Sequence, residues 1–325
     1  MQAKFLSYLV TAAILTAIDP ALAQQSTKIP RIGFVPVSGD PNTPGLLVEA
    51  FRGGLHELGY VEGKNILVEY RYPGEEPDRV SGSVAELVQL KVDVLVSSST
   101  GAIRAVKQAT KTIPIVIVTS IDPVETGIVE SLARPGGNIT GLTRLTRELS
   151  GKRLELFKEA VPGISRVGVL AARGFTGLKD YEPTARVLKI PLQYLEVQGP
   201  NPDLEGAFQA AAKGRANALV AILNPLLNRY QKQIADLAIK NRLPSMFESN
   251  YYVEAGGLVS YSGNDAEQYK RAAYYVDKIL KGAKPADLPV EQPTKFEFAI
   301  NLKTAKALNL TIPQSVLFRA DKVIK

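Results

Sequence analysis

The residues best suited to binding chemistry in this chain are three consecutive hydroxyl residues, Ser98, Ser99 and Thr100. Ser98 ends an apolar run at residues 92–98, and Ser99 and Thr100 follow it directly, before a segment with helical spacing. Unpaired N–H groups at a helix N-terminus, together with hydroxyl donors, favour a bound carboxylate. One Ser or Thr suffices to cap a helix. Three hydroxyls followed by Gly101 therefore predict a ligand-binding turn.

Two loops that follow other apolar runs carry further candidates. Ser38 and Asp40 lie in the loop 38–43, which matches neither the GxGxxG dinucleotide motif nor the GxxxxGK[ST] phosphate-binding motif. This loop either faces a ligand or is a plain turn that caps a helix. Asp122 precedes Pro123 and is therefore held extended. Its carboxylate either receives a ligand ammonium group or caps the next helix.

The second half of the chain offers equivalent positions. Arg173 and Phe175 follow the run 166–171, and Asn224 follows the run 216–223. Arg173 could pair with a carboxylate through two parallel hydrogen bonds, and Phe175 could cover an apolar ligand. Both residues are equally compatible with an ordinary surface position.

Three more candidates lie in an irregular passage at residues 247–264. They are Glu248, Tyr251 and Tyr261. Aromatic side chains between two lobes could clamp a flat ligand. Packing at a hinge would explain these residues as well.

The composition excludes several kinds of chemistry. The chain has no Cys, which excludes disulfides, thiolate catalysis and zinc–thiolate sites. Its one His, His56, lies in a helical segment, and no GxSxG motif accompanies it. The net charge is +7, but the Lys and Arg residues are scattered, which argues against nucleic-acid binding. We therefore expect a binding protein rather than an enzyme, with no cofactor, no metal and no nucleic-acid partner.

The candidate residues need strands that end near one another, and the pattern of the chain predicts such strands. With 325 residues the chain is long enough for two lobes. Short apolar runs alternate with amphipathic segments, which predicts an α/β fold of two doubly wound, parallel-sheet lobes. The predicted strands are residues 31–37, 65–72, 92–98, 113–120, 166–171, 190–197 and 216–223, and the predicted helices are residues 44–58, 79–90, 103–110, 147–160 and 230–241.

Three irregular passages interrupt this alternation, at residues 133–146, 247–264 and 281–293. A long helix is predicted at residues 266–280 and a last strand at residues 295–301. Three such passages predict three crossings of the chain between the two lobes. A simple two-domain string with one linker is the alternative.

The first 23 residues have the pattern of a secretory signal peptide. Lys4 precedes an apolar stretch at residues 5–18, and an A-x-A site ends at Ala23. Spanning a bilayer takes about 20 residues, so we expect cleavage before Gln24 and a soluble periplasmic protein. A short membrane-tethering helix is the alternative.

Four stretches of the chain each resemble the sequences of one protein family. They are RIGFVPV at residues 31–37, FRGGLHELGYVEGKNILVEYRY at 51–72, IPIVIVTSIDPVETGIVESLARPGGNITGLT at 113–143, and AAYYVDKILKGAKPADLPVEQPTKFEFAINLKTAKALNLTIP at 272–313. From residue 28 to the end the chain resembles the substrate-binding proteins of ABC transporters, in the family that includes tryptophan- and tyrosine-binding proteins.

The resemblance implies a type I periplasmic binding protein fold, with two lobes joined by three hinge crossings and a ligand enclosed between them. It implies a first lobe of residues 28–141 with 263–288, and a second lobe of residues 142–262 with 289–325. An ABC permease in the inner membrane is the implied partner, and we expect a monomer with no direct membrane anchor.

The resemblance also bears on the ligand. It implies that the turn 98–100 holds a ligand carboxylate and that the loop after the first strand and Asp122 line the cleft. Amino-acid-binding members carry an Asp-Asn pair in the second lobe, where this chain has Asn224 and Pro225. Without that acidic partner for an ammonium group, an aromatic or aliphatic carboxylate is favoured over an α-amino acid. A sensor-kinase partner with the same two-lobed form is an alternative function, and a secreted hydrolase is a weaker one.

Overall fold

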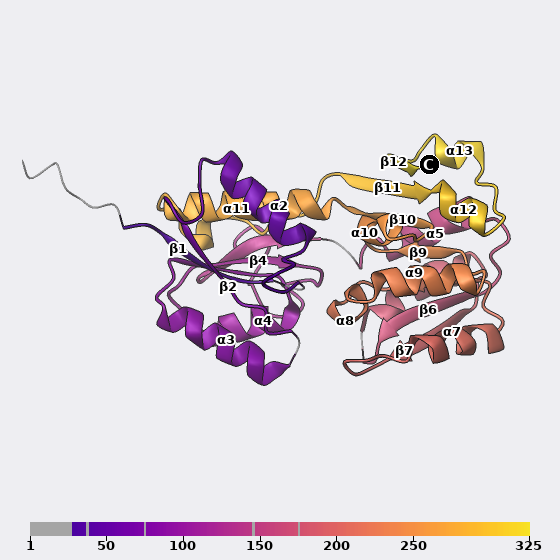
Figure 1. Ribbon diagram of the computed structural model, residues 1–325, viewed down its shortest axis with the longest axis horizontal. Coiled ribbons are helices and arrows are strands. Elements are labelled where there is room, and N and C mark those ends of the chain that lie inside the picture. Colours follow the sequence, from indigo (N-terminus) through magenta and orange to yellow (C-terminus); the bar gives the residue numbers. More distant parts are fainter. Residues whose placement is uncertain (1–27, 37–38, 75, 145–146, 175) are drawn as a thin grey trace, which may run out of the picture.

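The computed structural model describes residues 28–36, 39–74, 76–144, 147–174 and 176–325 (Figure 1). The segment predicted to be a signal peptide lies outside these residues. No helix in the described ranges is both long enough and apolar enough to span a membrane.

The first sheet has five strands, all parallel, in the order β2-β1-β3-β4-β5. Helices α2 and α11 cover one face, where they share an apolar core with the sheet, and α3 and α4 cover the other. The strands are β1 (Arg31–Val35), β2 (Leu67–Tyr70), β3 (Val94–Ser97), β4 (Ile115–Thr119) and β5 (Ile139–Thr143), and the helices are α2 (Leu46–Glu57), α3 (Pro77–Gln89), α4 (Thr100–Ala109) and α11 (Asp265–Leu280).

The second sheet has seven strands in the order β12-β11-β10-β9-β8-β6-β7. Its strands are β6 (Val167–Ala172), β7 (Leu192–Val197), β8 (Ala218–Ala221), β9 (Ser245–Phe247), β10 (Val259–Gly263), β11 (Phe296–Asn301) and β12 (Lys322–Ile324). The helices around it are α5 (Ser150–Ala160), η2 (Thr176–Tyr181), α6 (Glu182–Val187), α7 (Leu204–Lys213), α8 (Pro225–Asn228), α9 (Gln231–Lys240), α10 (Asn250–Glu254), α12 (Leu302–Ala307) and α13 (Gln314–Leu317).

The apolar runs of the sequence form strands, as predicted, and the central strands are buried. All residues of β3, β4 and β8 are buried, because helices on both faces of each sheet exclude water from both sides of the strand. Apolar residues of α5, α6, α12 and α13 share one core with this second sheet, and those of α7, α8 and α9 share another.

The chain crosses between the sheets three times, which confirms the predicted crossings. The first crossing connects β5 to α5, the second connects β10 to α11, and the third leads through the 3-10 turn η3 (Pro285–Asp287) to β11. Helix α11 thereby returns to the first sheet and packs against α2 (Figure 1). A Cβ on Gly54 of α2 would lie 2.9 Å from the Cα of Lys270, so this close packing needs glycine there.

Several expectations about the irregular passages were wrong. Residues 133–146 contain β5, and residues 247–264 contain α10 and β10. The strand at residues 296–301 is followed by another, β12. The second sheet is also not purely parallel, since β10 and β11 run antiparallel. Strands β5 and β10 are rich in Gly, Ser and Thr, and β9 and β12 have only three residues each, so none of these sequences contains the continuous apolar run used to predict strands.

Candidate ligand-binding cleft

A cavity of about 690 Å³ lies between the two lobes. Its wall from the first lobe includes Thr100, Gly101 and Arg104, and its wall from the second lobe includes Arg173 and Asn224. These residues follow the carboxyl ends of β3, β6 and β8. Ligands of doubly wound sheets bind at this edge, and the volume is typical of small-molecule sites.

The three residues of the hydroxyl turn, Ser98 to Thr100, are placed differently. Ser99 is the N-cap of α4, and its Oγ accepts a hydrogen bond from the Ala102 N–H at 3.2 Å. Thr100 begins the helix and lines the cavity together with Ser99. Ser98 is buried, with 7% of its surface exposed. Thr100 is therefore the hydroxyl of this turn best placed to meet a ligand.

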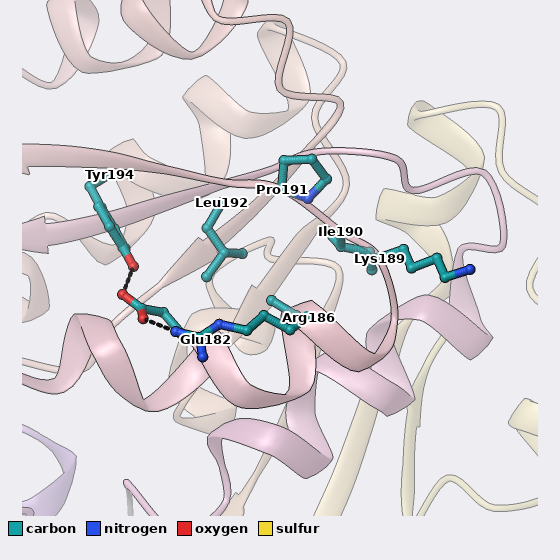
Figure 2. A pocket seen from close by; sticks show the side chains of 8 residues that line it. Glu182, Arg186, Lys189, Ile190, Pro191, Leu192 and Tyr194 are labelled. Carbon is teal, nitrogen blue, oxygen red and sulfur yellow. Dashed lines mark hydrogen bonds and ion pairs between the residues drawn. The ribbon is translucent and has the colours of Figure 1, made fainter.

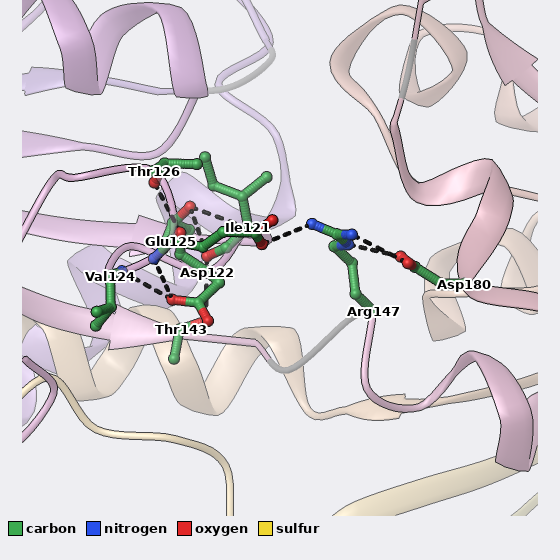
Figure 3. Close-up of polar contacts among 9 residues, drawn as sticks. Ile121, Asp122, Val124, Glu125, Thr126, Thr143, Arg147 and Asp180 are labelled. Carbon is green, nitrogen blue, oxygen red and sulfur yellow. Dashed lines mark hydrogen bonds and ion pairs between the residues drawn. The ribbon is translucent and has the colours of Figure 1, made fainter.

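Two predicted acidic residues close their own turns. The exposed Asp40 carboxylate accepts hydrogen bonds from the N–H groups of Asn42 and Thr43 at 2.8 and 3.1 Å and from the Thr43 hydroxyl. These bonds lower the pKa of Asp40. Asp122 accepts hydrogen bonds from the N–H groups of Val124 and Glu125 at 2.7 and 3.1 Å (Figure 3). The hydrogen bonds of Asp122 are those of a residue that caps the following turn, which is one of the two roles predicted for it; the other was binding of a ligand ammonium group.

Two candidates of the second lobe line the cavity. Arg173 is exposed, and its Nη1 donates a hydrogen bond to Oε1 of Gln198 at 3.0 Å. Asn224 is buried and is the N-cap of α8, with its Oδ1 accepting from the Leu227 N–H at 2.9 Å. Ser38 and Phe175 lie outside the described residues.

Glu248 lies beneath the cleft in a buried polar cluster. Its carboxylate accepts hydrogen bonds from the Tyr181 hydroxyl at 2.8 Å, from Arg153 at 3.2 Å and from the Leu223 N–H at 2.8 Å. Burial raises the pKa of Glu248, against the opposing effect of Arg153. Since Leu223 directly precedes Asn224, Glu248 fixes the end of β8 at the cleft.

The two tyrosine candidates lie in different places. Tyr251 lines a second cavity between the lobes, of about 220 Å³, whereas Tyr261 packs in the core beside Phe296 and Phe298, with ring centroids 5.8 and 6.5 Å away. The structure therefore brings Tyr251 to the interlobe region, whereas the partly buried Tyr261 packs against the second lobe's apolar core.

A buried charged pair lines this second cavity, and neither of its members was singled out from the sequence. Arg144 Nε lies 3.3 Å from Asp265 Oδ1, and Asp265 Oδ2 accepts a hydrogen bond from the Ser249 hydroxyl at 2.9 Å. Arg144 follows β5, and Asp265 begins α11. The pair therefore joins two of the three crossings. Their separation in the chain left no local signal by which to find them.

An arginine that was also missed connects the two lobes across the cleft. Arg147 donates to Asp180 through Nε at 2.6 Å and Nη2 at 3.0 Å, and to Glu125 through Nη1 at 3.0 Å (Figure 3). Glu125 follows β4 of the first sheet, and Asp180 lies in η2 beside the second. The Asp180 hydrogen bond is the first of the causes that raise the pKa of Arg147.

The sequence of this chain matches the family described as "ABC transporter substrate binding protein" over residues 34–324. The chain belongs to this family. The two-lobed fold and the cleft at the strand ends are the features expected of such a protein.

Individual relatives of this substrate-binding protein agree with the assignment. It is 27% identical over 266 residues to the tyrosine-binding protein of Clostridioides difficile (strain R20291), covering 81% of this chain and 76% of the relative. A conserved domain protein of Vibrio cholerae has 28% identity and a TM-score of 0.82, covering 91% of this chain and all of the other. A Streptococcus structure described as an ABC domain in complex with L-Trp has 24% identity and a TM-score of 0.81, covering 91% and 99% of the two chains. These similarities confirm the predicted type I fold.

A further cavity of this substrate-binding protein, of about 430 Å³, lies outside the cleft (Figure 2). It is formed by α6 and β7 of the second lobe alone, and Glu182 within it accepts hydrogen bonds from the Tyr194 hydroxyl at 2.6 Å and from Arg186 at 3.1 Å. A ligand there would not contact both lobes. Across the described residues, no group of three or more His, Asp or Glu side chains could hold a metal ion.

Proposed function

We propose that this chain is the periplasmic solute-binding component of an ABC importer. It captures a small organic carboxylate between its lobes and delivers it to a permease in the inner membrane. The single observation that carries the proposal is the cavity of about 690 Å³ whose wall is shared by both lobes. A ligand in such a cavity contacts both lobes only when they approach each other.

Capture then proceeds by a shift of population. A ligand first binds one lobe of the open form, and its contacts with the other lobe stabilise the closed form. The three crossings act as the hinge, and the closed form is the one that the permease recognises. Arg147 already contacts an acidic residue on either side of the cleft, which supports closure without a large rearrangement of this crossing.

Two observations support a carboxylate as the ligand. Thr100 lines the cavity at the N-terminus of α4, where a helix favours a negative charge. Asn224, a neutral residue, stands at the second-lobe strand end where an acid would receive an ammonium group. Aromatic and aliphatic carboxylates are the proposed class. Amino acids are the alternative that the relatives described as tyrosine-binding and L-Trp-bound support.

A thermal-shift screen of residues 24–325 tests the proposal. The panel contains aromatic acids, aliphatic acids and amino acids. A ligand at 100 times its Kd stabilises the folded state by about 2.7 kcal/mol, so a true ligand raises the melting temperature clearly. If none of the three classes raised it, the proposed function would be wrong. If only amino acids did, the carboxylate preference would be wrong while the binding function stood.

Export by a cleaved signal peptide is part of the proposal and has its own test. Expression of the full chain in a Gram-negative host, followed by periplasmic extraction and mass spectrometry, is expected to give a soluble protein that begins at Gln24. An intact N-terminus in the membrane fraction would instead indicate a tethering helix. Size-exclusion chromatography of the extract tests the proposed monomer, and limited proteolysis tests the proposed lobes of residues 28–141 with 263–288 and residues 142–262 with 289–325.

A further inference from the structure

The interlobe cavity is lined by more positively charged than negatively charged side chains. Three are arginines, Arg104, Arg147 and Arg173, and one is an acid, Glu125. Glu125 forms an ion pair with Arg147, whose guanidinium is also bound by Asp180. These two carboxylates are thus occupied by Arg147, and neither pairs with Arg104 or Arg173.

Arg104 and Arg173 come from opposite walls of the cavity. Arg104 lies on α4 of the first lobe, and Arg173 follows β6 of the second. Within the described part of the chain, no carboxylate forms an ion pair with either guanidinium, and the Arg173 guanidinium donates to the neutral side chain of Gln198. Both are exposed in this structure. Closure of the lobes would bring two unneutralised cations toward one enclosed space.

Another arginine of the second lobe lies beside a residue of the cavity wall. Arg229 ends α8, and its Nη2 lies 3.3 Å from the position that a Cβ on Gly74 would occupy. Gly74 belongs to the first lobe and lines the cavity. The absence of a side chain at Gly74 leaves room for this guanidinium. Arg229 also forms no ion pair with a described carboxylate, so it adds to the excess of positive charge.

The remaining wall is largely apolar. Val80 and Ile121 contribute to it from the first lobe, and Val197 and Leu226 from the second. Apolar walls with a few charged groups fit an organic ligand whose body is apolar and whose acidic groups are separated. Arginine is well suited to such groups because its planar fork binds a carboxylate through two hydrogen bonds.

We infer that the cleft selects a dianionic organic ligand, a small dicarboxylate, whose two acidic groups are held by arginines of opposite lobes, Arg104 and Arg173. This inference rests on the proposed function and narrows its ligand class from carboxylates to diacids. Mutual repulsion of the arginines opposes closure of the empty cleft, and a dianion removes that repulsion. The second negative charge is therefore what couples binding to closure.

The experiment compares acids that share one skeleton. Isothermal titration calorimetry of residues 24–325 measures benzoate against benzene-1,4-dicarboxylate and hexanoate against hexanedioate, with phenyl phosphate as a dianion of different chemistry and tyrosine and tryptophan as zwitterions. A diacid of at least one skeleton is expected to bind about 10-fold more tightly than its monoacid, because each charge-assisted hydrogen bond contributes well above a neutral one. Phenyl phosphate binding as tightly as the best diacid would overturn the choice of dicarboxylate.

Three variants locate the effect. Arg104→Gln and Arg173→Gln are each expected to remove most of the preference for the diacid. Arg134→Gln is the matched control, since Arg134 is also exposed in the first lobe but precedes β5 at the opposite edge of the sheet, and it is expected to keep the full preference. Melting temperatures of the unliganded variants show that each is folded.

Besides tight binding of phenyl phosphate, four results would overturn the inference. Equal affinity for monoacids and diacids would do so, as would binding of the zwitterions alone, and both would leave the proposed binding function standing. A diacid preference that survives both cleft substitutions would show that other residues hold the second charge. If no small molecule bound in the calorimeter or in the thermal-shift screen, the proposed function itself would fail together with the inference.

Discussion

Individual side chains at the cleft either stabilise the loops around it or line the cavity. Ser99, Asp122 and Asn224 accept hydrogen bonds from backbone N–H groups within their own turns. Thr100 and Arg173 line the cavity without capping a helix. The hydroxyl turn could be found from the sequence because a buried strand led directly into a helix there. Arg147 could not, because its partners Glu125 and Asp180 are brought to it only by the tertiary fold.

Thr100 provides the first test at this scale. Thr100→Ala removes a hydroxyl donor from the cavity wall and is expected to weaken ligand binding about 10-fold, since a hydrogen bond to a charged group contributes about 1.5–3 kcal/mol. Calorimetry with the best ligand of the screen measures it. Thr100→Ser keeps the hydroxyl and is expected to retain affinity within about 3-fold. Unchanged affinity in the alanine variant would remove Thr100 from the site.

Glu248 provides a test of stability. Glu248→Gln removes the carboxylate that pairs with the buried guanidinium of Arg153, which is expected to cost about 3 kcal/mol of unfolding free energy. Urea denaturation measures the loss. Glu254→Gln is the matched control, because Glu254 pairs with Lys322 at the surface and such pairs contribute at most about 1 kcal/mol. Equal losses in the two variants would contradict the role given to Glu248.

At the scale of elements, the predictable part of the fold is the part with a continuous apolar pattern. Strands β3, β4 and β8 are buried throughout, and their continuous apolar sequences predicted them. Strands β5 and β10, with sequences ITGLT and VSYSG, were missed because hydroxyls and glycines replace apolar residues there. Each of these two strands ends at a crossing between lobes. The small polar residues thus occur in the two strands that lead into the hinge.

An ion pair between Arg271 and Glu291 joins the third crossing to α11, and the Glu291 carboxylate of this pair titrates. Arg271 of α11 donates to Glu291 at 2.8 and 2.6 Å, and these hydrogen bonds are the first cause that lowers the pKa of Glu291. A carboxyl whose pKa is lowered by folding stabilises the protein above its unfolded pKa and loses that contribution as the pH falls. Urea denaturation from pH 7 down through about pH 4.5 to pH 3 is expected to show a steeper loss in the wild type than in Glu291→Gln. Parallel curves would contradict this assignment.

The whole molecule is organised around one cleft. Two sheets, each with its own cores, present their strand ends to a shared cavity. The buried Arg144–Asp265 pair joins two of the crossings, and Arg147 links acidic residues on the two sides of the cleft. The sequence predicted the two lobes and three crossings. It could not predict the volume of the cavity or the balance of charge in it, since both arise from residues that only the fold brings together.

The central claim is that one ligand closes the two lobes. Small-angle X-ray scattering of residues 24–325 tests this claim most directly. The protein is measured without ligand and with a saturating concentration of the best carboxylate from the thermal-shift screen, at a calorimetric stoichiometry of one. The account predicts a smaller radius of gyration and a narrower distance distribution with the ligand present. A ligand that binds at this stoichiometry while the scattering curve stays unchanged would contradict it.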